Sequence, residues 1–186
     1  MATINVTPTD FTMVEFSVDE IVAVAARVIE QADLSGVDEL NIDIDEASPL
    51  ARASIKSTDP LTLAVEGGAF EDTRRPRQLS EDRTADTIGR YVLKATDRIS
   101  GGFANAPTDD ELSLAQSVAW DVYCVGRLVR AGFKGQRKRR IYQFRNRHGF
   151  TDAADAAFDT LWTGSDLSWS DVDSISAAAC EASGLS

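Results

Sequence analysis

The chain of 186 residues has one histidine, His148, and histidine is the side chain whose ordinary pKa suits proton transfer near neutral pH. Asp152 follows four residues later, and a carboxylate beside an imidazole raises its basicity and fixes its tautomer. The nucleophile of such a site would be Cys124 or a serine or threonine. The alternative interpretation is that His148 caps a helix that ends at Gly149. We therefore assign no catalytic residue and keep His148 and Asp152 as candidates.

A strongly basic segment stands directly before this histidine. Residues 134–147, KGQRKRRIYQFRNR, hold seven Lys or Arg and no acid, although the whole chain has a net charge of −11. Arginine binds phosphate and carboxylate with two parallel hydrogen bonds, which makes the segment a candidate anion site. A second group of arginines lies in residues 67–79, where Gly67-Gly68 can offer backbone N–H groups. The candidate anion-binding residues are Arg137, Arg140, Arg145, Arg147, Arg74 and Arg75.

Opposite charge follows the basic segment. From residue 148 to the end there is no Lys or Arg, and there are seven acids. A basic and an acidic helix can pair within one chain or between subunits, which would make the basic segment part of the architecture. Seven cations on one helix cannot all face acids on another, so the remaining ones are the better candidates for a ligand.

Carboxylates cluster at DIDE, residues 43–46. Asp43 and Asp45 project from one face of an expected strand and Glu46 is adjacent, so the three are a weak candidate site for Mg²⁺ or Ca²⁺. The same spacing is typical of any exposed strand face. Arg52 and Lys56 on the next strand are natural cross-strand partners for these acids.

The sequence lacks the motifs of several common metal, nucleotide and hydrolase sites. The lone histidine rules out a two-histidine zinc peptidase helix, and Cys124 and Cys180 lack the CxxC spacing of a structural zinc site. The chain has no GxGxxG, P-loop or GxSxG motif. We therefore expect no cofactor and no metal. The negative net charge disfavours nucleic acid and anionic membranes at long range.

The expected elements follow from periodicity. A polar leader over residues 1–16 precedes a helix that the capping box Ser17–Glu20 opens and Gly36 ends. Alternating residues then predict three strands, around Ile42, Ala53 and Leu63, before a loop over residues 67–79. Because only short turns separate the strands, an antiparallel meander is expected.

Helical patterns fill the rest of the chain. One helix runs from Ser80 to Gly101, and the longest and most buried one is expected from a capping box at Thr108 to about Ala131. Another spans the basic segment, and Thr151 and Ser170 cap the last two. The fold class is α+β, with the meander packed by four or five helices. We expect a single domain over residues 1–186, with a helix–strand part at 17–79 and a helical part at 80–186.

Three functions remain open. The first is a non-enzymatic protein-interaction or homo-oligomerising module, in which the basic and acidic helices are the pairing surfaces. The second is an enzyme or binding protein for a phosphorylated or carboxylated small molecule, using Arg137, Arg140 and Arg147 with His148. The third is nucleic-acid binding through the basic helix, with Tyr142 and Phe144 stacking on bases. The start of the chain has no secretory signal and no apolar run is long enough to span a membrane, so a cytoplasmic location is expected.

Overall fold

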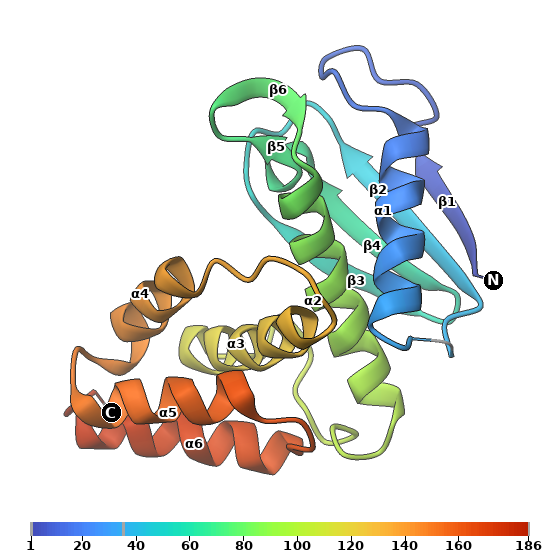
Figure 1. Ribbon diagram of the computed structural model, residues 1–186. Helices are drawn as coiled ribbons and strands as arrows, with labels where there is room; N and C mark the ends of the chain where they lie inside the picture. Colours follow the sequence, from blue (N-terminus) through green and yellow to red (C-terminus); the bar gives the residue numbers. More distant parts are fainter. Residues whose placement is uncertain (1, 35, 186) are drawn as a thin grey trace. The chain divides into compact units, whose positions relative to one another are not determined.

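The computed structural model describes residues 2–34 and 36–185 and divides into two compact units, Met1–Thr96 and Asp97–Ser186. Helix α2 (Glu81–Ile99) runs from the first unit into the second. The described chain has six α-helices and a small mixed sheet, so the expected α+β class is confirmed (Figure 1). The single-domain expectation stays a prediction, and each unit is described by itself.

Unit 1 is built on a sheet of four strands. These are β1 (Thr3–Thr7), β2 (Glu39–Asp45), β3 (Ala53–Thr58) and β4 (Leu61–Glu66), in the spatial order β1-β2-β4-β3. β1 pairs with β2 and β2 with β4 in parallel, whereas β3 and β4 are antiparallel. Helix α1 (Val18–Gln31) connects β1 to β2, as a crossover between parallel strands requires.

The predicted meander is therefore wrong in its connections. β2 does not pair with β3, because β4 inserts between them and β3 folds back outside it. The polar leader also holds a strand, since Ile4 and Val6 alternate with polar residues in β1. Alternation predicts a strand and its inward face, but every strand with the same pattern competes equally as a partner. The choice among these partners is made by packing over the whole unit.

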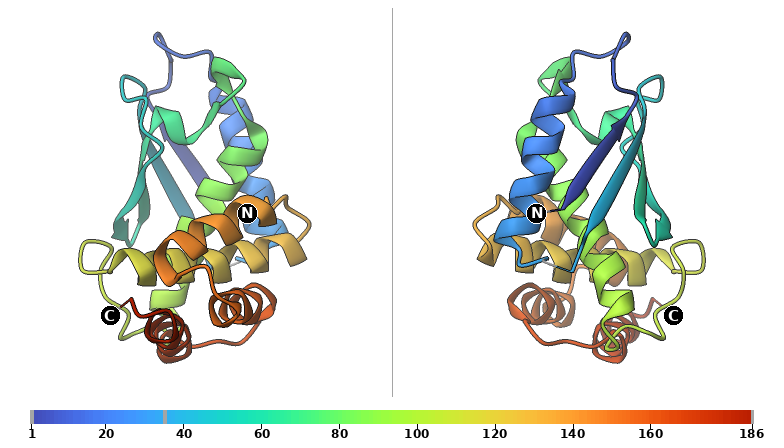
Figure 2. Two further views of the ribbon diagram at one scale, coloured as in Figure 1. Left: turned by 90° about the vertical axis from the view of Figure 1, so that its left-hand side faces the viewer. Right: turned by 90° about the vertical axis from the view of Figure 1, so that its right-hand side faces the viewer.

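Alternation decides which face of the sheet is covered. Leu40, Ile42 and Ile44 of β2 are buried, and so is every second residue of β4. Figure 2 shows α1 and α2 on one side of the sheet and an open face on the other. Ser17 caps α1 as predicted, by accepting a hydrogen bond from the Glu20 N–H at 3.3 Å. The helix ends at Gln31, before the predicted stop at Gly36.

Residues 67–79 are more ordered than the predicted loop. They form a short 3-10 helix, η1 (Gly67–Ala69), and a hairpin of β5 (Glu71–Asp72) and β6 (Arg75–Leu79). The hairpin contains Pro76 and has a register shift, so it lacks the regular alternation by which a strand is recognised.

Unit 2 holds four more helices, α3 (Leu114–Arg130), α4 (Arg137–His148), α5 (Asp152–Thr163) and α6 (Trp169–Ala182). α3 packs against the other three, which confirms its predicted central and buried position. It begins after Ser113 rather than at Thr108, and its 17 residues are fewer than the 19 of α2. Thr108 instead closes a separate turn with Glu111. Thr151 caps α5 as predicted, while Ser168 rather than Ser170 caps α6.

Candidate functional site

His148 lies inside unit 2 with no exposed surface. Its Nδ1 is 3.1 Å from the carbonyl oxygen of Phe144, and its Nε2 is 2.8 Å from the hydroxyl of Ser176. A carbonyl can only accept, so Nδ1 carries the proton and Nε2 accepts from Ser176. Burial lowers the pKa of His148, and the hydrogen bond to Phe144 opposes this only in part. The imidazole is therefore neutral near pH 7.

The geometry around His148 is that of a structural residue. The ring stacks on Phe144 with centroids 3.7 Å apart, and both ring nitrogens are occupied. Ser176, whose hydroxyl bonds to the ring, is itself 2 % exposed, so a substrate has no approach to the pair. Asp152, the predicted orienting acid, lies exposed in the first turn of α5. The described contacts therefore favour the helix-end interpretation over a catalytic one.

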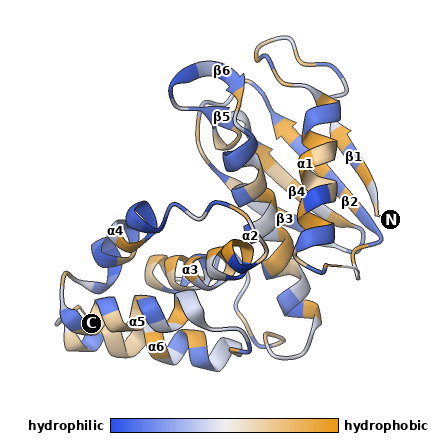
Figure 3. Cartoon of the chain, in the orientation of Figure 1, coloured by the Kyte–Doolittle hydropathy of each residue, from blue (hydrophilic) through white to orange (hydrophobic). Residues whose placement is uncertain are grey.

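The basic helix α4 is partly neutralised by α5. Figure 3 shows α4 coloured as one of the hydrophilic segments of the chain. Arg145 donates two hydrogen bonds to Asp155, one of them from Nε at 2.7 Å. This hydrogen bonding lowers the pKa of Asp155 and raises that of Arg145. Arg137 pairs with Asp159, and its guanidinium lies 5.2 Å from the ring centroid of Phe158. Two of the four anion-binding candidates on α4 thus have acidic partners within the chain.

Other residues of α4 remain on the surface. Arg147 is exposed and its side chain has no partner among the described residues, while Arg140 is half-buried and makes a 3.4 Å contact to Gln143. Tyr142 is 59 % exposed and meets the 63 % exposed Phe150 edge to face. Phe144, in contrast, is fully buried, so the predicted stacking of Phe144 on bases is wrong. Its position on the inward side of α4 leaves it no contact with solvent.

The arginines of the β5–β6 hairpin belong to unit 1. Arg75 bonds to Asp72 at 3.0 Å and Arg74 is exposed. Gly67 and Gly68 are buried, and the Gly68 N–H donates to the Ser48 carbonyl at 3.1 Å. A Cβ on Gly68 would stand 2.0 Å from the carbonyl oxygen of Pro49. Gly68 therefore serves close backbone packing, and its N–H is already used within the chain.

The three carboxylates of the predicted cluster do not lie together in one site. Asp43 and Asp45 line a shallow groove of about 500 Å³ on the open sheet face, together with Arg52 and Lys56. Glu46 instead accepts hydrogen bonds from the N–H groups of Thr12 and Met13, which lowers its pKa. Among the described residues no group of three or more His, Cys, Asp or Glu is placed to hold a metal ion.

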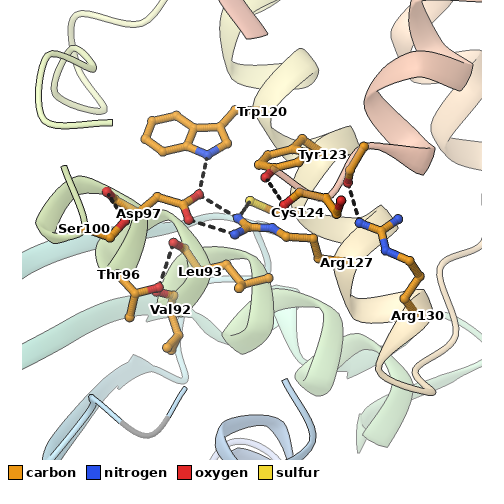
Figure 4. A network of polar contacts seen from close by, with 12 residues as sticks. Val92, Leu93, Thr96, Asp97, Ser100, Trp120, Tyr123, Cys124, Arg127 and Arg130 are labelled. Atoms are coloured by element: carbon orange, nitrogen blue, oxygen red, sulfur yellow. Dashed lines mark hydrogen bonds and ion pairs between the residues drawn. The ribbon is translucent and has the colours of Figure 1, made fainter. Parts of the chain in front are cut away.

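A buried polar network occupies the core of unit 2 (Figure 4). Asp97 accepts hydrogen bonds from Trp120 at 3.0 Å and from both terminal nitrogens of Arg127, at 2.8 and 2.6 Å. The Arg127 guanidinium also lies 4.4 Å from the ring centroid of Tyr123. Tyr123 donates to the Ser165 carbonyl at 2.9 Å, and burial raises the pKa of its hydroxyl. Because both oxygens of Asp97 are engaged, this cluster is a structural element of the unit.

The two edges of the four-stranded sheet differ in how they are protected. β3 carries Lys56, follows the exposed Arg52 and contains a register shift between Ile55 and Ser57. Charges and bulges of this kind prevent another strand from pairing with an edge. β1 has the sequence TINVT, with no charge, no proline and no register shift. It is therefore the unprotected edge of the sheet.

The backbone of β1 offers hydrogen bonds outward. The Thr3 N–H donates to the Asp38 carbonyl at 2.8 Å, so Thr3, and with it Asn5 and Thr7, bond toward β2. Ile4 and Val6 alternate with these residues and direct their N–H and C=O groups away from the sheet. In the described part of the chain no strand lies on that side of β1.

A groove of about 560 Å³ lies beside this edge, between β1 and α1. Its apolar lining includes the half-buried Ile4, Val22 and Ala26. The charged residues that line it in the described part of the chain are the acids Glu30, Asp33 and Asp38. An open strand edge and an apolar groove side by side are the two parts of a surface that binds an extended peptide. Figure 2 shows β1 as the outermost strand next to α1.

The sequence signal for this surface was weak but present. TINVT alternates like the other strands, but its five residues lie in a segment read as a polar leader. The half-exposed Val22 and Ala26 widen the apolar stripe of α1 beyond what the sheet covers. An apolar stripe wider than one buried face is the pattern that can indicate such a surface before a structure is known.

The comparisons with known proteins add no relationship. No family model, no curated protein and no solved structure matches this chain. Over the described residues, no helix combines the length and the apolar character needed to cross a lipid bilayer.

Proposed function

We propose that this protein is a non-enzymatic protein-interaction module that binds an extended peptide segment by strand addition to β1. The observation that carries the proposal is the asymmetry between the two sheet edges. β3 is protected by Lys56 and a bulge, whereas β1 is uncharged and directs the backbone groups of Ile4 and Val6 outward. An added strand would satisfy these groups and continue the sheet.

The two alternative functions that involve His148 or the arginines of α4 receive less support from the structure. An acid–base role for His148 requires an accessible ring nitrogen, and both nitrogens are occupied inside the unit. On α4, Arg137 and Arg145 already pair with acids of α5, so Arg147 is the exposed anion-binding candidate that has no acidic partner among the described residues. A pure peptide-binding role needs none of these groups, and it uses backbone hydrogen bonds that the fold leaves open.

The test is selection of peptides from a displayed library of random 12-residue sequences on the full chain. Synthetic copies of enriched peptides are then titrated against Ile4→Pro, which removes the outward N–H without removing a hydrogen bond to β2. We expect binding at least about tenfold weaker, since one backbone bond is lost and the ring obstructs the added strand. Ile4→Val keeps the N–H and is expected to bind within about twofold of the original chain.

Ala53→Pro is the matched control on the other edge. The Glu66 N–H bonds to the Arg52 carbonyl, so Ala53, the next residue, also directs its N–H away from the sheet. This variant should bind the peptides normally. Amide hydrogen exchange gives a measurement without any substitution: the Ile4 and Val6 amides should gain protection when peptide binds. Failure to enrich peptides, or equal binding by Ile4→Pro without added protection at these amides, would overturn the proposal.

A further inference from the structure

We infer that the segment bound at β1 is cationic at one end, with Lys or Arg next to apolar residues that enter the groove between β1 and α1. This inference rests on the proposed function and names the chemistry of the partner. It draws on a separate observation, which is the charge of the groove. Strand addition alone would accept a segment of any charge, because backbone hydrogen bonds are shared by all residues.

The apolar part of the groove sets the pattern of the partner. Ile4, Val22 and Ala26 are half-buried, and Ile29 and Val37 form the buried floor. Side chains of an added strand point alternately to the two faces of the sheet. Every second residue of the partner therefore faces this groove, and an apolar side chain there removes apolar surface from water.

The charged part of the groove lies at one end only. Glu30 lies in the last turn of α1 and Asp33 follows the end of the helix, while Asp38 precedes β2 and bonds to Thr3, so all three stand where β1 begins. All three are exposed, and among the described residues no Lys or Arg lines the groove. Residues 1–96 hold eighteen Asp or Glu against nine Lys or Arg. A partner with cations at this end gains attraction, and one with acids is repelled.

A second copy of this chain fits the groove poorly. Residues 2–26 contain no Lys or Arg, so the side chains around β1 in another copy bring no cation to the three acids. Pairing of two β1 strands would instead place two acidic units beside each other. Charge complementarity therefore favours a different, basic protein segment as the occupant.

The experiment compares peptides and groove variants. Peptides selected as above should carry more Lys and Arg than the starting library, concentrated at one end of an alternating apolar stretch. The double variant Glu30→Gln and Asp33→Asn keeps side-chain size and removes two charges, and asparagine tolerates the positive φ of Asp33. Exposed ion pairs are weak and screened by salt, so the loss expected on removing two of them is several-fold to about tenfold at low salt.

A matched control carries the same change in net charge elsewhere. Asp43→Asn with Asp45→Asn alters the open sheet face and should leave binding within about twofold, which excludes a general effect of charge. Enriched peptides that depend on Ile4 but show no excess of cations would overturn this inference and leave the proposed function standing. Absence of any Ile4-dependent peptide would overturn both. A dimer in sedimentation analysis that Ile4→Pro dissociates would identify a second copy as the occupant and overturn the inference of a basic partner.

Discussion

Strand β1 and helix α4 make opposite use of their polar groups. α4 lies in the most charged stretch of the chain, and two of its arginines already have acidic partners on α5. β1 has no charge at all, and the backbone groups of Ile4 and Val6 point away from the sheet. Charge density is conspicuous in a sequence, but an interaction surface is made by groups that the fold leaves unpaired. Such groups can belong to the least conspicuous segment.

The largest effect on stability should come from a substitution that separates α5 from α3. Helix α5 carries the acids that pair with α4, so this contact also positions the acidic partners of the basic helix. A Cβ on Gly126 would stand 2.1 Å from the Trp162 carbonyl oxygen, so Gly126→Ala must push two helix backbones apart. We expect a loss of about 3 kcal/mol of unfolding free energy. All three tryptophans lie in unit 2, so fluorescence during urea unfolding measures this unit.

Gly102→Ala is the control for this substitution. No atom lies within 4 Å of a Cβ built there, so a change within about 0.5 kcal/mol is expected. Equal losses in the two glycine variants would show that the close approach of α3 and α5 is not what holds the acidic helix in place.

The next largest effect is a pH dependence of stability, caused by His148 at the buried end of α4. The pKa of His148 is lowered by burial, so the unfolded chain binds its proton at a higher pH than the folded one does. Stability is therefore full above about pH 6.5, the ordinary value for histidine, and falls as the pH drops below it, by at most about 1.4 kcal/mol per pH unit. Urea unfolding at pH 7.5 and 5.5 measures the change.

His148→Gln should be less stable at pH 7.5 and should lose most of the pH dependence in this range. The carboxylates with lowered pKa values, such as Asp155, titrate below this window. An unchanged pH dependence in the variant would contradict a buried, neutral imidazole.

A smaller effect separates the paired from the unpaired cations of α4. Arg145→Glu removes the pair with Asp155 and places two acids together, which should cost about 1 kcal/mol at low salt. Arg147→Glu makes the same charge change on the same helix at an exposed position and should cost clearly less. Fluorescence-monitored urea unfolding of both variants gives the comparison. Equal costs would mean that pairing with α5 does not position α4.

The smallest effect on stability is expected at the protected edge of the sheet. Lys56→Thr removes the charge from the exposed side of β3 and should change stability by less than about 0.5 kcal/mol. If the charge of Lys56 helps to prevent other strands from pairing with β3, the variant should self-associate more than the original chain. Light scattering as a function of protein concentration measures this, and unchanged scattering would leave the register shift as the main protection of β3.

Local patterns predicted the elements better than their connections. The capping residues Ser17 and Thr151 begin helices where they were expected to, because a cap is recognised from a few neighbouring residues. Thr108 and Ser170 were wrong as helix starts, since Ser113 and Ser168 offer competing capping boxes nearby. The order of the strands could not be predicted, because Ile42, Ile55 and Leu63 lie in patterns that fit several partners equally well.

The candidate site followed the same division. The opposite charges before and after residue 148 predicted a basic and an acidic helix able to pair, and Arg145 with Asp155 is one such pair. The free edge of the sheet at Ile4 was not predicted. Whether β1 is an edge strand depends on the order of the strands, in which β4 lies on the other side of β2. No single segment carries that information.

The sequence by itself determined the α+β class, the inward faces of β2 and β4, the central position of α3 and the absence of familiar metal and nucleotide motifs. These follow from periodicity and residue chemistry, which act over a few residues. Only the tertiary structure decided that His148 is enclosed by Phe144 and Ser176, and that β1 is a free edge beside an acidic groove. Burial and unpaired hydrogen-bonding groups arise from which distant segments meet, and that choice is made by the packing of the whole unit.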